Sequence, residues 1–366
     1  MIFTVGGEGE LGFDTTSERG LYIVIWIGIV ALILSLLLVF QTLLLRALLV
    51  VRQRRSEGFL KTWRPLLMQS LEAVPTSLPR ILPGDVYTFL SVWNYLHESL
   101  LAATKENLNH LARQIKMDKI ARQMLRHRSL RQQLMAIVTL GHLRDTSAWE
   151  HLQNLALSRH TVLSLAAARA LLQINPPDAI RWLFPLIAKR QDWPLTRVVG
   201  FLKETGADIV SNPLAYKLIT SEPKDQARLV RFLDVAHSEV VLDVIRFLLR
   251  NSKDEQVIHH CLQFITDPED AIYARACLTH PEWFVRVQAA VALGRVGLNE
   301  DQVRLIPLLE DPQWWVRYRT AQSLVNWPSI GLSKLERLAA THPNPFAREI
   351  LAQAMAERRM KGDVQR

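Results

Sequence analysis

Residues 280–286 read His-Pro-Glu-Trp-Phe-Val-Arg, residues 311–317 read Asp-Pro-Gln-Trp-Trp-Val-Arg, and residues 342–348 read His-Pro-Asn-Pro-Phe-Ala-Arg. The three segments are 31 residues apart, and nearly the same step relates a column of large apolar residues along the chain. With one step of 29 before Leu293, this column consists of Leu140, Leu171, Leu202, Leu233, Phe264, Leu293, Leu324 and Met355. Such periodicity indicates a repeat protein, in which each unit stacks on its neighbours to bury its apolar face.

The spacing within each unit predicts helices. Small apolar residues precede the column position by three and four residues, as Ala289 and Ala290 precede Leu293. This is helical spacing, and small side chains allow a neighbouring helix to approach closely. A unit of 31 residues holds two helices of about ten to twelve residues and two short turns. The sequence therefore predicts an all-α fold, an α-solenoid of about seven to eight two-helix repeats over residues 128–358.

The repeat pattern resembles that of the HEAT and HEAT-like (bilin-lyase-type) family, in which Asp-Pro is followed by Val-Arg, Ala-Ala and Leu. The matching residues are Asp311, Pro312, Val316, Arg317, Ala321 and Leu324, and in the preceding unit Pro281, Val285, Arg286, Ala289, Ala290 and Leu293. In that family the Asp and the Arg commonly form a hydrogen-bonded ladder between units. The resemblance therefore implies structural roles for Arg286, Asp311, Arg317 and Arg348, although His280 and His342 replace the acidic residue in two units.

A single apolar segment near the N-terminus predicts a transmembrane helix. Residues 21–45 carry no charge, and 25 residues form about 37 Å of helix against a hydrocarbon core of about 30 Å. The charge changes sign across the segment, from −3 before it to +5 between Arg46 and Arg64. Because positive flanks stay in the cytoplasm, we expect a single-pass protein of a bacterial inner membrane. Residues 1–20 would then form a short extracytoplasmic N-terminus, and the repeats would lie in the cytoplasm.

The remaining segments are expected to connect or terminate the array. Residues 46–84 read as a basic juxtamembrane helix and a Pro-rich linker, residues 85–127 as a helical capping or adapter region, and residues 359–366 as a disordered tail. Terminal units of repeat arrays are atypical, so an irregular pattern is expected there.

Basic residues are concentrated before the repeats, and the array itself is nearly neutral. The positive charge has two interpretations, a solvated helix face with a topology signal or contact with anionic lipid headgroups or an acidic partner. Candidates for the second are Arg52, Arg54, Arg55, Arg113, Lys116, Lys119 and Arg122. A solenoid that binds nucleic acid would spread basic residues along one face of the array, and this chain does not.

The sequence offers little for catalysis or for metal binding. His259, His260 and Cys261 are adjacent, and adjacent helical side chains point about 100° apart, so they cannot converge on one ion. Iron-dependent hydroxylases built from HEAT-like repeats need several His-Glu pairs, whereas this chain has only His97-Glu98. We expect no enzyme activity, cofactor, metal or small-molecule substrate. Cys261 and Cys277 suggest no disulfide framework.

Aromatic residues recur at the start of three successive repeats. Trp283, Trp314 and Pro345 align, as do Phe284, Trp315 and Phe346. They could form an inter-repeat hydrophobic ladder, or an exposed ridge that anchors a partner, since Trp is common among interface anchors.

The function predicted from these features is a membrane-anchored cytoplasmic scaffold that binds a protein partner. The resemblance to bacterial HEAT-repeat proteins behind one membrane helix suggests a complex with an envelope polysaccharide glycosyltransferase. Two alternatives stay open, a HEAT-like lyase or hydroxylase and a juxtamembrane binder of anionic lipid or nucleic acid.

Overall fold

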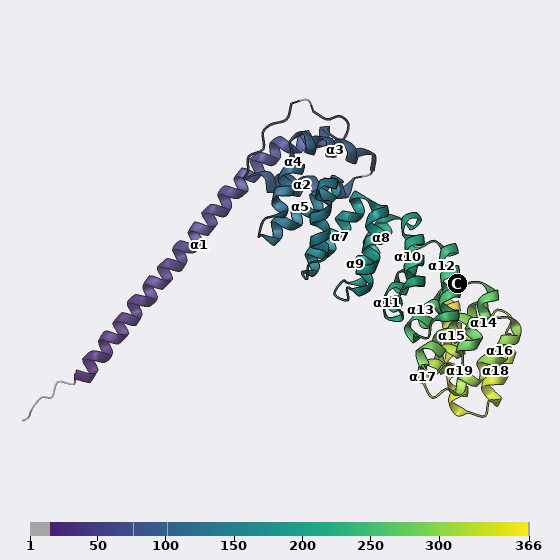
Figure 1. Ribbon diagram of the computed structural model, residues 1–366. Coiled ribbons are helices and arrows are strands. Elements are labelled where there is room, and N and C mark those ends of the chain that lie inside the picture. Colours follow the sequence, from purple (N-terminus) through teal and green to yellow (C-terminus); the bar gives the residue numbers. More distant parts are fainter. Residues whose placement is uncertain (1–14, 76, 101, 365–366) are drawn as a thin grey trace, which may run out of the picture. The chain divides into compact units, whose positions relative to one another are not determined.

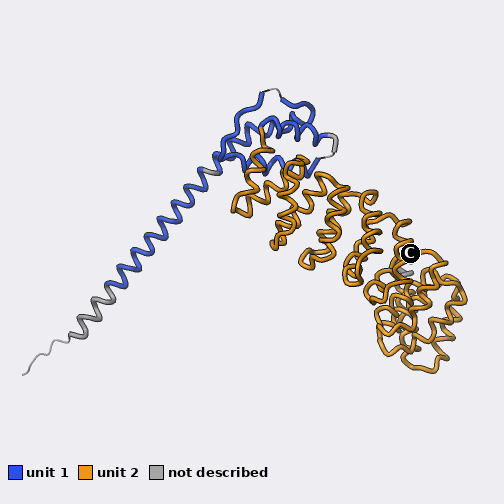
Figure 2. Tube along the Cα trace, in the orientation of Figure 1, with its two compact units in different colours: residues 1–115 blue, residues 116–366 orange. Residues whose placement is uncertain are grey.

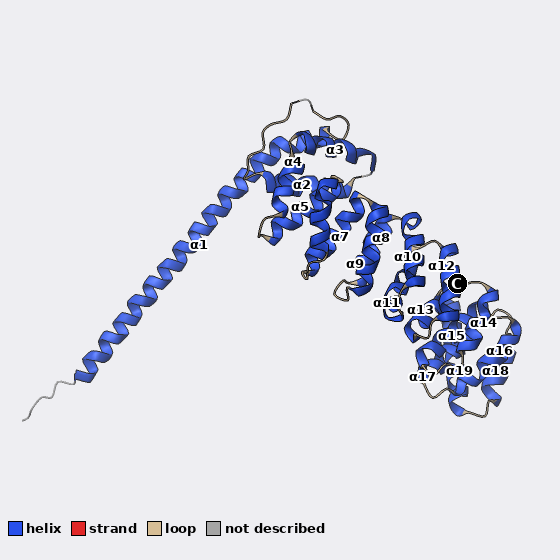
Figure 3. Cartoon of the chain, in the orientation of Figure 1, coloured by secondary structure: helices blue, strands red, loops and turns tan. Residues whose placement is uncertain are grey.

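The protein is all-helical in the part that the structure describes. The computed structural model describes the backbone of residues 15–75, 77–100 and 102–364, and the side chains of most of these residues from Trp26 onward. Nineteen α-helices and five short 3-10 helices are present in these ranges, with no strand among them (Figure 3). This confirms the predicted all-α class.

The chain divides into two compact units, residues 1–115 and residues 116–366 (Figure 2). The repeats were expected to begin at residue 128. The second unit begins twelve residues earlier, because helix α4 (Met117–Leu125) packs against α5 (Leu130–His142) as one member of a helix pair. Part of the predicted capping region therefore belongs to the solenoid.

Helix α1 (Thr15–Gln69) dominates the first unit and is longer than the predicted span. Its described part contains an 18-residue window of mean hydropathy 2.6 with no buried residue, so it is long and apolar enough to cross a membrane. Large apolar side chains stay exposed past the predicted end at Leu45, as far as Val51. The helix then continues without a break into the region predicted as a separate juxtamembrane segment. Residues 1–14 of the predicted extracytoplasmic segment lie outside the described residues.

The end of α1 packs against α2 (Val86–Ser99), and α2 packs against α3 (Ala102–Gln114). Trp63 is buried, with its ring centroid 5.1 Å from that of Phe89 in an edge-to-face arrangement. The indole of Trp93 donates a hydrogen bond to the Leu108 carbonyl, 3.1 Å away. Residues 85–127, expected to be a helical capping or adapter region, are mainly helical here, with α2 packed against the end of α1 and α3 against α2.

The second unit is an α-solenoid of eight helix pairs in two layers (Figure 1). The first layer, called here the ladder layer, contains α5, α7 (Thr161–Ile174), α9 (Leu195–Thr205), α11 (Pro223–Leu229) with the 3-10 helix η2 (Val230–Val235), α13 (Glu255–Gln263), α15 (Trp283–Val296), α17 (Trp314–Val325) and α19 (Pro345–Val364). Each packs against the next helix of its own layer.

The second layer alternates with the ladder layer along the chain. It contains α4, α6 (Trp149–Ala156) after η1 (Thr146–Ala148), α8 (Pro176–Lys189), α10 (Ala207–Thr220), α12 (Ser238–Asn251), α14 (Ala271–Cys277) after η3 (Pro268–Asp270), α16 (Gln302–Leu305) between η4 (Asn299–Asp301) and η5 (Ile306–Glu310), and α18 (Leu332–Thr341). Eight pairs agree with the predicted seven to eight repeats.

The periodic column lies in the core of the ladder layer. Six of its members are buried, and Phe264 and Met355 are partly buried against the same core. The middle of the array is less regular than the pattern suggested, because Leu233 lies in the 3-10 helix η2 and Phe264 follows the end of α13. At the other end, α19 extends to Val364, whereas residues 359–366 were expected to form a disordered tail.

Candidate protein-interaction surface

The aligned aromatic residues lie in the first turns of three neighbouring helices of the ladder layer. We call the set Trp283, Phe284, Trp314, Trp315, Tyr318 and Phe346 the aromatic edge. Helices α15 and α17 begin at the first aromatic residue of each pair, two residues after the aligned prolines Pro281 and Pro312. Helix α19 likewise begins two residues after the aligned Pro343, at Pro345. Because the three helix starts are one repeat apart, the aromatic residues recur at equivalent places.

Four of the six side chains are exposed. Their exposed fractions are 39% for Trp283, 43% for Trp314, 54% for Trp315 and 61% for Phe346. Phe284 is partly buried, and its ring centroid lies 5.6 Å from that of His259. Tyr318 is also partly buried, so the geometry favours the exposed ridge over the inter-repeat ladder at the four exposed positions and not at Phe284 or Tyr318.

The rings of the central repeat are held in place by one another. The ring centroids of Trp314 and Trp315 are 4.8 Å apart and edge-to-face, while Trp314 and Tyr318 stack at 4.9 Å. The hydroxyl of Tyr318 donates to Glu357 at 2.8 Å, and this hydrogen bond raises the pKa of Tyr318 above its usual value. Ring pairs restrict the rotation of these side chains before any partner binds. The side chains would therefore lose less conformational entropy when a partner binds.

The arginine that follows the aromatic residues closes the turn at each helix start. Nη1 of Arg286, Arg317 and Arg348 donates to the carbonyl six residues earlier, at 2.8, 2.7 and 2.8 Å. Arg286 also binds both carboxylate oxygens of Asp311 in the next unit, at 2.7 and 2.9 Å. The implied Arg–Asp ladder between units is present at this step. Arg317 and Arg348 donate to carbonyls within their own units, those of residues 311–312 and 342–343.

The two histidines that replace the acidic residue perform only half of its role. Oδ1 of Asp311 accepts a hydrogen bond from the backbone N–H two residues later, at 2.9 Å. Nδ1 of His280 and Nδ1 of His342 accept the equivalent bonds at 3.1 and 3.2 Å. Imidazole can therefore replace the carboxylate in the turn, but it offers no pair of anionic oxygens to a neighbouring arginine.

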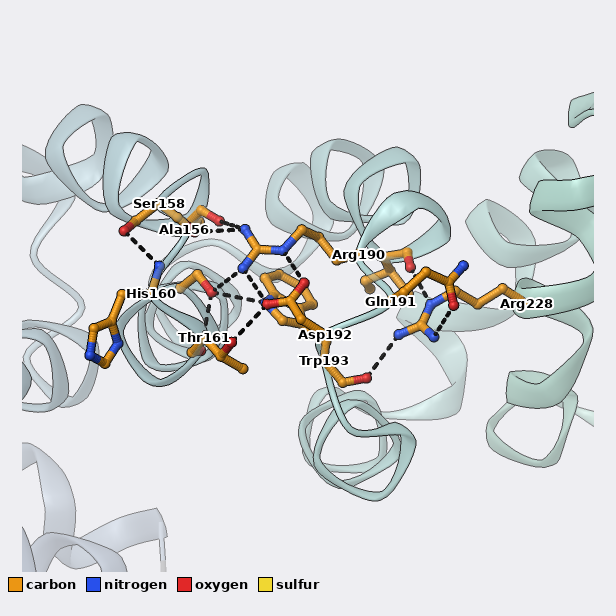
Figure 4. Close-up of polar contacts among 11 residues, drawn as sticks. Ala156, Ser158, His160, Thr161, Arg190, Gln191, Asp192, Trp193 and Arg228 are labelled. Carbon is orange, nitrogen blue, oxygen red and sulfur yellow. Dashed lines mark hydrogen bonds and ion pairs between the residues drawn. The ribbon is translucent and has the colours of Figure 1, made fainter.

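A second set of arginines, which sequence reasoning missed, binds backbone carbonyls about one repeat away. Arg190 donates to the Ala156 and Ser158 carbonyls at the end of α6, and Arg228 to the Ile187 and Trp193 carbonyls at and after the end of α8 (Figure 4). Arg295 and Arg358 bind carbonyls at the ends of α13 and α17. Cations at helix C-termini satisfy unpaired carbonyls and oppose the helix dipole.

Arg190 is fixed in this position by its neighbours. Its Nε and Nη2 donate to the two carboxylate oxygens of Asp192, each at 2.7 Å, and this hydrogen bonding lowers the pKa of Asp192 to about 2. The Thr161 hydroxyl also donates to Asp192, at 2.9 Å (Figure 4). The network joins α7 to the end of α8, so its role is structural.

Ion pairs between units also occur in the second layer. Arg246 pairs with Asp270 at 2.8 Å, and Arg275 binds both oxygens of Asp301 at 2.7 and 2.8 Å. The hydrogen bond from Arg275 lowers the pKa of Asp301. A separation of 24 to 26 residues between the arginine and the aspartate is the sequence signal that could have identified these pairs.

The basic residues proposed to contact lipid or an acidic partner differ in their surroundings. Arg55 binds both carboxylate oxygens of Asp85, at 2.9 and 3.0 Å, and Arg122 pairs with Asp118 and Asp145. Arg54, Arg113, Lys116 and Lys119 are exposed, and the side chain of Arg52 lies outside the described residues. The ion pairs compensate the charges of Arg55 and Arg122 within the chain, which makes these two weaker candidates than the other basic residues.

The described residues contain no group of three or more His, Cys, Asp or Glu side chains that could hold a metal ion. Nδ1 of His259 bonds to the Phe284 carbonyl at 3.2 Å, and Nδ1 of His260 to the Gln256 carbonyl at 2.8 Å. Burial raises the pKa of the Cys261 thiol to about 12, so this thiol is protonated and unreactive near neutral pH.

Comparison with known proteins gives no family for this chain. No family model matches the sequence, and no curated protein matches it. Among solved structures, a crystal structure of an engineered protein is similar at 17% sequence identity and a TM-score of 0.36, over 79% of this chain and 86% of that chain.

Proposed function

We propose that this protein is a membrane-anchored scaffold whose α-solenoid binds a protein partner through the aromatic edge. The observation that carries the proposal is the exposure of Trp283, Trp314, Trp315 and Phe346 on adjacent helix starts. A row of exposed aromatic residues on a rigid array is the type of surface from which interface anchors are drawn. The apolar part of α1 would supply the anchor.

The proposal includes a location and a kind of partner. The charge change across the apolar segment supports a single-pass protein of a bacterial inner membrane, with the solenoid in the cytoplasm. The resemblance of the repeats to the HEAT-like family supports a membrane-associated partner, such as an enzyme of an envelope polysaccharide glycosyltransferase complex. A partner at the membrane also suits a solenoid tethered by a single helix.

The proposed topology predicts where a C-terminal reporter will be active. A fluorescent protein that matures only in the cytoplasm, fused after Arg366, should be fluorescent, and alkaline phosphatase fused at the same place should be inactive. Active alkaline phosphatase would place the solenoid outside the cytoplasm and contradict the assignment. Exchanging the charges on the two flanks should invert the result, because basic flanks determine orientation.

The aromatic edge predicts a loss of partner binding without a loss of stability. Trp314→Ala and Trp315→Ala in the full-length protein should each weaken partner binding about 30-fold, since truncating an interface anchor costs about 2 kcal/mol or more. The melting temperature should change little, because both side chains are exposed. Partner capture from membrane extract, paired with a thermal melt of the same samples, measures both effects.

Tyr216→Ala is the matched control, because Tyr216 is 70% exposed on α10 and lies outside the aromatic edge. It should leave capture and melting unchanged. A fall of several degrees in the melting temperature of the tryptophan variants, with normal capture below the melt, would mean that the rings stabilise the array and do not bind the partner.

A further inference from the structure

A small polar pocket lies between α15 and α17, on the same two helices as the aromatic edge but further along each of them. Its volume is about 180 Å³. The residues that line it are Val291, Gly294, Arg295, Arg319, Gln322, Ser323 and Asn326. A side chain at Gly294 would collide with Ser323, since an added Cβ would lie 2.8 Å from the Ser323 Cβ. The absence of a side chain at Gly294 therefore permits the close helix approach that forms the pocket floor.

The lining is rich in hydrogen-bond donors and contains no carboxylate. Two guanidinium groups, a hydroxyl and two amides lie around the pocket, contributed by Arg295, Arg319, Ser323, Gln322 and Asn326. Nη1 of Arg295 donates to the Gln263 carbonyl at 2.7 Å and Nη2 to the Leu262 carbonyl at 2.9 Å, which fixes this side chain. Desolvation lowers the pKa of Arg295.

Arg319 is positioned by a chain of hydrogen bonds. Nη1 of Arg319 donates to Oε1 of Gln322 at 2.9 Å. The Nε2 group of Gln322 is bound to the Tyr318 hydroxyl at 2.7 Å and to Glu357 at 3.3 Å, so its carbonyl oxygen is directed to the arginine. A guanidinium has five N–H donors, and the one bond to Gln322 leaves most of those of Arg319 available to a ligand.

We propose that this pocket binds a small oxyanion, a carboxylate or a phosphate, through Arg319 with Ser323 and Asn326. A guanidinium binds both kinds of oxyanion in a bidentate fork, which explains why an arginine is placed here. The volume exceeds that of several water molecules, so a phosphate or a carboxylate group fits. The proposal does not depend on partner binding at the aromatic edge.

The test is calorimetric titration of the full-length protein in detergent with inorganic phosphate and, separately, with succinate. Chloride holds the ionic strength constant. We expect saturable binding of at least one of the two anions, and the arm that binds more tightly identifies the source of the oxyanion. Arg319→Gln should weaken that binding at least about tenfold, because a charge-assisted hydrogen bond is lost. Arg319→Lys keeps the charge but not the fork, so its affinity for the anion should lie between that of the unaltered protein and that of Arg319→Gln.

The control variant is Arg337→Gln, since Arg337 is exposed on α18 and does not line the pocket. It should bind as the unaltered protein does, and so should Trp283→Ala, which changes the aromatic edge at a ring that does not contact Tyr318. Saturable binding lost only in the Arg319 variants supports the proposal. Failure of both anions to bind, or equal binding by Arg319→Gln and Arg337→Gln, would overturn it.

Discussion

Replacing Leu293 by alanine should lower the free energy of unfolding of the solenoid by about 2–5 kcal/mol, and Leu324→Ala should have a similar effect. Both side chains are buried in the ladder layer, on the adjacent helices α15 and α17. Removing three carbon atoms loses their transfer free energy and leaves a cavity that the helices on either side cannot fill. The measurement is the denaturant midpoint of the full-length protein in detergent, followed by far-UV circular dichroism.

Leu157→Ala is the matched control for these substitutions. Leu157 follows α6 and is 57% exposed, so the same chemical change should alter stability by about 0.5 kcal/mol or less. Equal midpoints for Leu293→Ala and Leu157→Ala would show that the periodic column does not form the core of the array.

The ladder layer could be predicted from the sequence because its period is carried by large apolar residues. Leu140, Leu171 and Leu202 follow one another at the same step, and burial is the one environment that requires leucine at each of them. Where the backbone changes from an α-helix to a 3-10 helix, the 31-residue step still predicts which residue is buried, but it does not predict the backbone conformation at that residue. Leu233 keeps its place in the column although its segment is a 3-10 helix.

Five of the six residues of the aromatic edge were predicted as a set, all except Tyr318, but the exposure of their side chains was not. The side chain of a residue at the start of a helix can point toward the next unit or away from it. The sequence spacing is identical for these two orientations, so it cannot distinguish them. The structure distinguishes them residue by residue, since Trp315 is exposed while Phe284, at the equivalent place one repeat earlier, packs on His259. The difference depends on a neighbour contributed by another helix, which the pattern does not encode.

The arginines that bind carbonyls were missed because their acceptors belong to the backbone. Arg286 could be recognised by its aspartate, but the acceptors of Arg190 and Arg295 are carbonyl groups that every residue has. Only the relative position of successive units shows which helix end each arginine reaches. The same dependence on packing applies to Arg122, which was one candidate for contact with lipid or an acidic partner and which pairs with Asp145.

Arg228→Met should destabilise the solenoid by about 2–5 kcal/mol. Arg228 is only 7% exposed, and its guanidinium donates to the Ile187 carbonyl at 2.7 Å and the Trp193 carbonyl at 2.9 Å. Methionine retains most of the apolar volume but leaves both carbonyls without this donor, and each buried unsatisfied group costs about 1–3 kcal/mol. Burial lowers the pKa of Arg228, which means that the folded protein bears a desolvation cost for the charge. Methionine removes that cost, so the expected loss of stability is smaller than the summed cost of the two unsatisfied carbonyls.

Arg231→Met is the control, because Arg231 is exposed and three residues further along the same segment. Its positive charge disfavours the charge on Arg228, so its removal should leave stability unchanged or raise it slightly. Arg228→Lys should be intermediate, since an ammonium cannot reproduce the fork that reaches both carbonyls. If Arg228→Met and Arg231→Met unfolded at the same denaturant concentration, apolar packing alone would join α8 to α11. Stability should instead follow the number of carbonyl bonds retained, from arginine to lysine to methionine.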